Sequence, residues 1–169
     1  MIQQAIETDD PVVFYEPKRR YWDKGEVDED GAPKLGLHDA RVAREGEHVT
    51  LATYGPMVRV ALEAAQAAAE EGKSIEVIDL RSLSPLDMDT LAASVEKTGR
   101  LVVTHEASTF LGMGAEVAAE ITQRCFYHLE APVLRVGGYN LPYPPSKLEE
   151  EFLPDLDRVL DGVDRALAY

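Results

Sequence analysis

The sequence predicts an α/β fold of three layers, in which a mostly parallel, twisted sheet carries helices on both faces. Short apolar segments rich in β-branched residues alternate with amphipathic segments along residues 48–169. The alternation repeats at the spacing of βαβ units, roughly 30 residues. Glycine, proline or a capping residue marks most of the expected ends. Strands joined through helices pair in parallel and need cover on both faces, so this pattern favours a doubly covered sheet over a sandwich or a bundle.

Four segments have the composition of buried strands. Each is short, is rich in valine, isoleucine or leucine, and is bounded by charged residues, glycine or proline. They are "HVTLATYG" (48–55), "SIEVIDLRS" (74–82), "RLVVTHE" (100–106) and "APVLRVGG" (131–138).

Two helices are expected between the first three strands. The first begins near Pro56, which suits a first helical turn, and its apolar stripe runs to Gly72. The second begins in "SPLD" (84–87), which combines a cap, a first-turn proline and an acid, and it ends at Gly99. Both therefore have helix-start and helix-stop signals at a length that fits a crossover.

Three further helices are expected after the third strand. The segment 114–125 places Val117, Ile121 and Cys125 on one stripe. Ser146 and Glu149 have the spacing of a capping box in "PSKLEEEF". A last amphipathic helix is expected from about Asp155; its apolar residues are Leu156, Val159, Leu160, Val163 and Leu167.

The N-terminal third has a different organisation. Val12 to Tyr15 form a short apolar run between two prolines, which is typical of a buried strand. Residues 23–47 are charged, contain several glycines and prolines and lack periodicity, so they are expected to be a surface linker. The domains expected are therefore a strand-bearing remnant at 1–22, a linker at 23–47 and an α/β domain at 48–169.

Composition excludes several functional classes. Acidic residues outnumber basic ones 31 to 17, and the resulting charge of −14 disfavours binding to nucleic acid or to an anionic membrane. No apolar run approaches the roughly 18 residues of a membrane span, and no secretory signal is visible. A single cysteine fits a reducing compartment, so a cytoplasmic protein is expected.

The stretch "THEASTFLGMGAEV" (104–117) is the candidate binding site. Ligands of open α/β sheets bind beyond the carboxyl ends of the strands, where His105 and Glu106 are expected. Gly112 and Gly114 open the next helix, whose N–H groups could hold an anion. The third glycine of a dinucleotide fingerprint is missing. The alternative, a tight turn with a structural His–Glu pair, is the more common arrangement.

The other titratable residues favour structural roles. Asp79 and Arg81 could form an anion clamp, but a salt bridge that orders the loop is the commoner use of such a pair. Cys125 lies on an apolar stripe and is expected to be an inert core thiol. His38, His48 and His128 lack metal-ligand spacing, so no metal site is expected.

Five blocks carry a resemblance to a known family. They are "DPVVFYEPKRRYW", "VTLATYGPMV", "EVIDLRSLSPLDMDTLAASVEKTGRLVVTHEA", "LEAPVLRVGGYNLPYP" and "LPDLDRVLDGVDRAL". In sequence and order they resemble the C-terminal half of the β subunit of 2-oxo acid dehydrogenases, in the transketolase superfamily. "EPKRRYW" is more similar to branched-chain members than to pyruvate members. The resemblance implies a transketolase C-terminal domain-like fold.

The resemblance also implies a division of labour. In this family, thiamine diphosphate and Mg²⁺ are bound by the α subunit and by the β-subunit half that precedes "DPVVF", so no catalytic, cofactor-binding or metal residue is carried over. The chain alone is expected to be inactive. An α₂β₂ heterotetramer, in the bacterial cytoplasm or the mitochondrial matrix, is implied. On this resemblance residues 1–22 end the preceding pyrimidine-binding domain.

The resemblance further implies a docking role for the C-terminal domain. Its acidic groups contact the basic peripheral subunit-binding domain of the dihydrolipoyl acyltransferase. The matching candidates here are Glu130 and the terminal carboxylate of Tyr169, whereas Leu134 stands where some relatives carry a second acid. Two other hypotheses stay open at this point: a free-standing phosphate- or nucleotide-binding module, and a pyruvate dehydrogenase or another transketolase-superfamily member.

Overall fold

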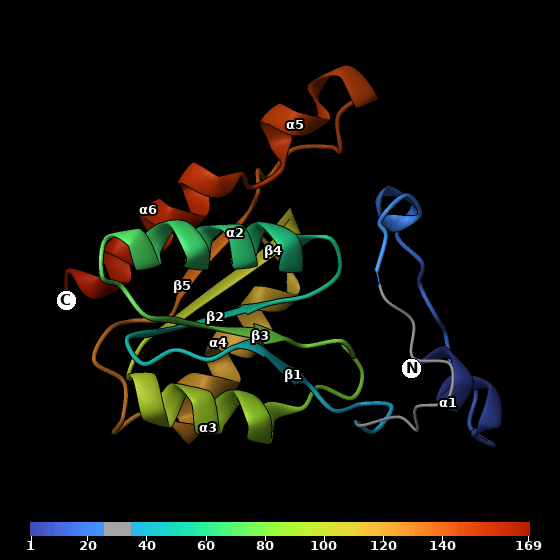
Figure 1. The fold of residues 1–169 in the computed structure, drawn as a ribbon, viewed down its shortest axis with the longest axis horizontal. Helices are drawn as coiled ribbons and strands as arrows, with labels where there is room; N and C mark the ends of the chain where they lie inside the picture. The colour runs from blue at the N-terminus through green and yellow to red at the C-terminus, as the bar shows by residue number, and fades with distance from the viewer. Residues whose placement is uncertain (26–34) are drawn as a thin grey trace.

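The computed structural model describes residues 1–25 and 35–169, and a five-stranded sheet forms its centre (Figure 1). The strands are β1 (Arg41–Arg44), β2 (Val49–Thr53), β3 (Ile75–Asp79), β4 (Leu101–Ser108) and β5 (Leu134–Gly138). Their order is β1-β3-β2-β4-β5. β1 pairs with β3 antiparallel, and the other pairs are parallel.

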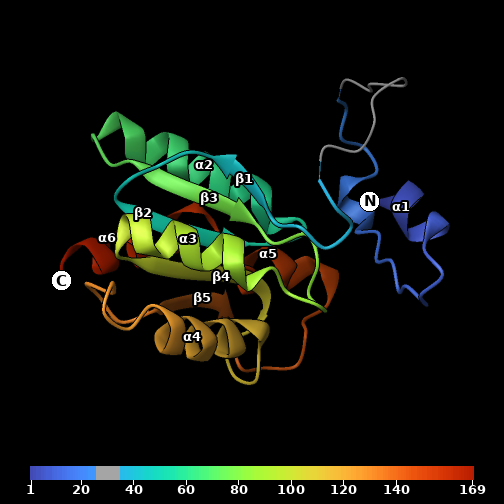
Figure 2. The ribbon, with the colours of Figure 1, turned by 90° about the horizontal axis from the view of Figure 1, so that it is seen from below.

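Four helices cover the two faces of the sheet, which confirms the three-layer fold (Figures 1 and 2). α2 (Met57–Glu70) and α6 (Leu156–Leu167) pack on one face, while α3 (Met88–Thr98) and α4 (Met113–Arg124) pack on the other. The smaller elements are α1 (Ile2–Glu7), η1 (Lys18–Arg20), η2 (Ser146–Leu148) and α5 (Glu149–Phe152). Among the described residues no helix is long and apolar enough to cross a membrane.

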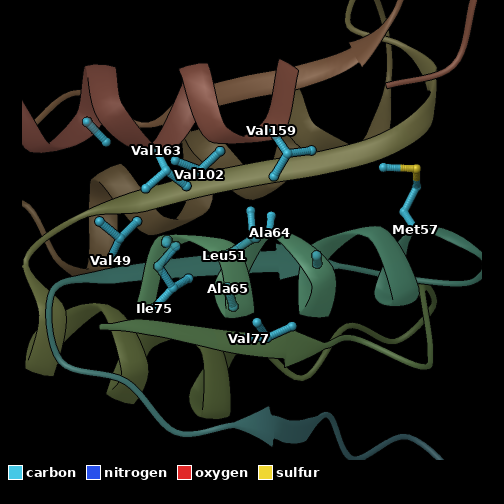
Figure 3. Close-up of a cluster of buried hydrophobic side chains, with 13 residues drawn as sticks. Val49, Leu51, Met57, Ala64, Ala65, Ile75, Val77, Val102, Val159 and Val163 are labelled. Carbon is cyan, nitrogen blue, oxygen red and sulfur yellow. The ribbon is translucent and has the colours of Figure 1, made fainter. Parts of the chain in front are cut away.

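The strands are buried on both sides because alternate residues enter two separate cores. Leu51 of β2 packs with α2 and α6, whereas its neighbour Ala52 packs with α3 and α4. Figure 3 shows the first of these cores, where Ala65 of α2 lies next to Val77 of β3 and Ala64 faces Val159 of α6. Small side chains on this helix let its backbone approach the sheet closely, so strand valines and isoleucines fill the space.

The helix ends agree with most of the expected signals. Asp155 caps α6 by accepting a hydrogen bond from the Arg158 amide, and Gly99 ends α3 with φ at +69°. Two expectations need correction. α3 begins at Met88, capped by Asp87, and not within 84–87 as predicted. Ser146 makes no side-chain cap, so the predicted capping box does not form.

The N-terminal third differs from its prediction in two places. Val12 to Tyr15 form no strand, and Val13 and Tyr15 are 77% and 87% exposed. An apolar run gives a strand only where a neighbouring strand offers hydrogen bonds, and none lies beside it in the described structure. Residues 41–44, expected to be linker, form the edge strand β1. Residues 26–34 of that predicted linker lie outside the described part.

The topology gives the sheet two ends that differ in which helix termini they carry. Each helix between parallel strands runs back against them, so helix N-termini gather at the carboxyl ends of the strands and helix C-termini at the amino ends. The N-terminal segment lies beyond the carboxyl ends, and the C-terminus lies at the amino ends (Figures 1 and 2). We call these the carboxyl end and the amino end of the sheet.

Candidate functional sites at the two ends of the sheet

The carboxyl end contains the position where an open α/β sheet usually binds ligands. β2 and β4 are neighbours, yet the chain leaves them into helices on opposite faces, α2 and α4. Tyr54 follows β2, and its ring stacks on His105 of β4 with the ring centroids 6.1 Å apart. The structure therefore brings predicted site residue His105 to this switch point.

His105 is fully buried, and backbone groups occupy both of its ring nitrogens. Nδ1 donates to the Ala107 carbonyl at 2.9 Å, so Nε2 is the unprotonated nitrogen that accepts from the Gly114 amide at 3.1 Å. Burial lowers the pKa of His105, although the Ala107 carbonyl opposes the shift. A neutral imidazole with both nitrogens engaged offers a ligand neither a charge nor a hydrogen bond.

Gly112 and Gly114 make room for this ring. A Cβ atom at Gly114 would lie 2.7 Å from Nε2 of His105, and one at Gly112 would lie 2.1 Å from the Ser108 carbonyl oxygen. The helix N-terminus that was predicted to hold an anion thus donates to the His105 side chain. The geometry supports the alternative, a tight turn with a structural histidine, but without the His–Glu pair.

Glu106 points away from His105 and interacts with the N-terminal segment. Arg19 lies 3.9 Å from Glu106 and 2.5 Å from Glu149, which accepts a hydrogen bond from Tyr143. Burial raises the pKa of Glu106, Arg19 opposes this effect, and Glu149 adds to it. The ion pairs connect η1, β4 and α5, and they are the main polar link between the N-terminal segment and the domain.

The carboxylates of this end do not fit a magnesium–diphosphate site. Within the described ranges no group of His, Cys, Asp and Glu is arranged to hold a metal. Asp79 and Arg81 order the loop, as expected, but not through a salt bridge to each other: Asp79 pairs with Arg41 at 3.0 Å and accepts from the Arg81 amide, and the Arg81 guanidinium donates to two loop carbonyls. Cys125 is fully buried, and burial raises its pKa, as expected for a core thiol.

A groove lined by arginines was not predicted from the sequence. It has a volume of about 520 Å³ and lies between the outer edge of β5 and α6. Arg135, Arg158 and Arg165 line it together with Asp157 and Asp161. Arg158 donates to the carbonyls of residues 137 and 152, and Arg165 lies 3.5 Å from Asp161. Arg135 lies on β5 and the other four lie on α6, so the groove exists only where this helix packs beside the edge strand.

The amino end brings together the two residues predicted to bind a partner. Glu130 follows α4, is mostly exposed, and pairs with Arg100 at 2.6 Å. Arg100 also donates from Nε to the Ala166 carbonyl in the last turn of α6, three residues before Tyr169. Figures 1 and 2 both show the chain that joins α4 to β5 close to the C-terminus.

The amino end also carries an exposed pair of aromatic side chains. Phe126 and Tyr127, which precede Glu130 in the same loop, are 63% and 96% exposed and contact each other edge to face. Leu134, which stands where some relatives have a second acid, packs against the core shared by α2 and α6. The sequence did not single out the aromatic pair because an apolar pair after an amphipathic helix usually continues its buried stripe.

Comparison with known proteins gives a consistent family. The family model of the transketolase C-terminal domain matches residues 38–159. A pyruvate dehydrogenase E1 component subunit beta from Leifsonia xyli is 56% identical over all of this chain and 50% of its own length. A 3-methyl-2-oxobutanoate dehydrogenase subunit beta from Mycobacterium tuberculosis is 51% identical over 99% of this chain and 48% of its own length.

A solved structure agrees with these sequence relatives. A split-gene transketolase, determined as an inactive beta4 tetramer, superposes with a TM-score of 0.68 at 31% identity. The match covers 84% of this chain and 46% of that chain. The chain spans about half the length of the curated relatives it matches.

Proposed function

Because this chain belongs to the transketolase C-terminal domain family, we propose that it is the C-terminal portion of the β subunit of a 2-oxo acid dehydrogenase. One observation carries the proposal: essentially the whole chain aligns, at 51–56% identity, with subunits named as β subunits of such enzymes. The complete enzyme would decarboxylate a 2-oxo acid oxidatively and transfer the acyl group to a lipoyl group. A cytoplasmic location, as proposed for a bacterial enzyme of this kind, is part of the same inference.

The proposed substrate is a branched-chain 2-oxo acid such as 3-methyl-2-oxobutanoate. Relatives named for this substrate class reach 51% and 46% identity. Pyruvate is the second candidate, because the 56%-identical relative is named a pyruvate dehydrogenase subunit.

Assembly is the first role proposed for this portion. Residues 1–22 are proposed to complete the preceding pyrimidine-binding domain, where Val13, Tyr15 and Trp22 would become buried. All three are more than 75% exposed in the described structure, and such apolar side chains are usually covered in the assembled protein. The α subunit and a second β subunit are the proposed neighbours. Thiamine diphosphate with Mg²⁺ would supply the electron sink for decarboxylation when bound in the complete enzyme.

The first experiment tests whether this portion is catalytic alone. The 169-residue chain is assayed with thiamine diphosphate, Mg²⁺ and either 3-methyl-2-oxobutanoate or pyruvate. No turnover is expected, because no described residue cluster fits the cofactor and metal. The matched control is the heterotetramer assembled with complete β subunit. Turnover by the chain alone would contradict the proposal.

Docking to the acyltransferase is the second proposed role. Glu130 and the carboxylate of Tyr169 are proposed to receive the basic peripheral subunit-binding domain. Glu130→Lys reverses one of these charges, so binding should weaken by roughly tenfold to a hundredfold at low salt, with the difference shrinking as salt rises. Isothermal titration calorimetry of the subunit with the isolated binding domain measures this. Equal affinities of Glu130→Lys and the wild type at low salt would exclude Glu130 from the interface.

A further inference from the structure

The amino end of the sheet is electronegative for a reason that goes beyond its side chains. α2, α3, α4 and α6 all end there, so four sets of terminal carbonyls direct their partial negative charge to one surface. The terminal carboxylate and Glu130 add full charges at the same place. Acidic residues also flank the helix ends and strand starts there: Glu45, Glu47, Glu71, Glu96 and Asp164. Lysines pair with three of these acids, Glu45, Glu71 and Asp164, so the helix carbonyls, Glu130 and the terminal carboxylate are the groups that favour a cationic partner.

Lys73, Lys97 and Arg100 all pair with acids of this end, and Arg100 is the least exposed of the three. Arg100 begins the chain segment that enters β4, and only 20% of its side chain is exposed, whereas 60% of the Glu130 side chain is. Nη1 contacts Glu130 Oε2 at 2.6 Å, and Nε donates to the Ala166 carbonyl at 3.1 Å. A single guanidinium thus joins the loop after α4 to the last turn of α6.

The backbone around Arg100 reinforces this link. The Glu130 amide donates to the Gly99 carbonyl at 2.8 Å, and Gly99 adopts a φ of +69°, which favours glycine. A Cβ atom at Gly99 would lie 3.0 Å from the side-chain carbons of Glu130. Glu130 is therefore fixed through both its backbone and its carboxylate, while most of its side chain stays exposed.

We propose that Arg100 is a positioning residue that joins Glu130 and the C-terminal helix into one docking surface for the basic domain of the acyltransferase. This inference rests on the docking role proposed above. Phe126 and Tyr127 form the apolar border of the surface, since aromatic side chains next to charged groups are typical of interface hot spots. Arg100 does not contact the partner in this arrangement; it fixes the two negative groups at the separation that the partner recognises.

The direction in which Arg100→Gln changes the affinity for the partner distinguishes a positioning role from an effect of the positive charge alone. Arg100 is positive, so if it acted only through its charge, Arg100→Gln would strengthen binding of a cationic partner. Positioning predicts the opposite, a weakening of roughly tenfold. Arg100→Lys keeps the charge, but its single nitrogen cannot contact both the Glu130 carboxylate and the Ala166 carbonyl. This variant should therefore weaken binding as well. Under the charge-only explanation Arg100→Lys would leave affinity unchanged.

The experiment measures binding of the subunit to the isolated peripheral subunit-binding domain by calorimetry. Arg124→Gln is the matched control, because Arg124 lies at the end of α4, pairs with Glu120 and Asp89, and makes no contact with Glu130. Its removal should leave affinity unchanged or slightly increased. Thermal melts of each variant confirm that the fold is retained.

A double-mutant cycle completes the test. If Arg100 acts through Glu130, most of the loss caused by Arg100→Gln disappears in a Glu130→Gln background. An equal loss in both backgrounds would show a general structural defect and overturn the inference. Unchanged or tighter binding by Arg100→Gln in the wild-type background would also overturn it while leaving the docking role intact. If the wild-type subunit does not bind the domain at all, the docking role itself fails.

Discussion

At the scale of single residues, hydrogen bonding inside the sheet decides which polar side chains stabilise the fold. Thr50 and Thr104 are both fully buried threonines of central strands. The Thr50 hydroxyl lies 2.7 Å from the hydroxyls of both Ser94 and Thr98. The Thr104 hydroxyl has no hydrogen-bond partner among the described residues. The same residue type is therefore favourable at one site and costly at the other.

Replacing each threonine by valine should have opposite effects. Thr104→Val removes an unsatisfied buried hydroxyl, so the free energy of unfolding should rise by about 1 kcal/mol. Thr50→Val removes the hydrogen bonds to Ser94 and Thr98, of which Thr98 keeps a bond to the Arg100 carbonyl, so the free energy of unfolding should fall by about 1–3 kcal/mol. Urea unfolding at constant m-value measures both. A loss of stability in Thr104→Val comparable to that in Thr50→Val would show that Thr104 is satisfied, for example by buried water.

At the scale of secondary-structure elements, Asp87 does more than an ordinary helix cap. Its carboxylate accepts from the Thr90 amide and hydroxyl at the start of α3, and also from the Ala40 amide, which leads into β1. Asp155 caps α6 through one bond to the Arg158 amide. Asp87 thus connects the start of α3 to the edge strand. The helix begins after Asp87, the last residue of "SPLD", and Ser84 does not cap it.

Removing each cap should lower the free energy of unfolding by a different amount. Asp87→Ala should lower the free energy of unfolding by about 2 kcal/mol, whereas Asp155→Ala, the matched control, should lower it by about 1 kcal/mol. Burial opposes ionisation of Asp87, but its hydrogen bonds outweigh burial and hold its pKa below the ordinary value. Its contribution is therefore present above pH ~4 and is lost as pH falls through the lowered pKa.

The acid limb of the stability curve checks this assignment. Urea midpoints are measured for wild type and Asp87→Ala from neutral to acidic pH. The two midpoints should converge at the lowest pH, where Asp87 is protonated. A constant difference across that range would mean that the carboxylate charge of Asp87 contributes nothing.

At the scale of the whole molecule, residues 1–22 and the α/β domain are expected to behave as separate units. The N-terminal segment is connected to the domain mainly by the ion pairs of Arg19 with Glu106 and Glu149, and both acids retain contact with solvent. Its apolar side chains contribute little to the two cores, whose members all lie at residue 40 or beyond. Surface ion pairs of this kind stabilise weakly.

Limited proteolysis tests this separation. Trypsin should cleave first at Lys18, Arg19 or Arg20, which are exposed, and leave the remaining domain resistant. Deleting residues 1–22 should shift the melting temperature by less than about 4 °C. Calorimetric melting of the deleted and complete chains measures this; a much larger fall would show that the segment belongs to the cooperative unit.

The sequence alone determined the layered part of this protein. The alternation of β-branched strands with capped amphipathic helices predicts β2 to β5 and the helices between them, because both periodicities are local properties of the chain. Five sequence blocks resemble a known family, and this resemblance predicted the family of the chain. Cys125 was placed in the core for the same reason, because its position on an apolar stripe is a local property.

Only the tertiary structure decided the roles that depend on distant residues. Whether Val12 to Tyr15 form a strand depends on a neighbouring strand, and whether 41–44 form one depends on β3, more than thirty residues away. His105 became a buried neutral side chain because the turn at Gly112 and Gly114 folds back onto it. Arg100 joins Glu130 to α6 only once the sheet has brought three separate segments together. Local pattern predicts elements, but contact between elements determines which side chains remain available for function.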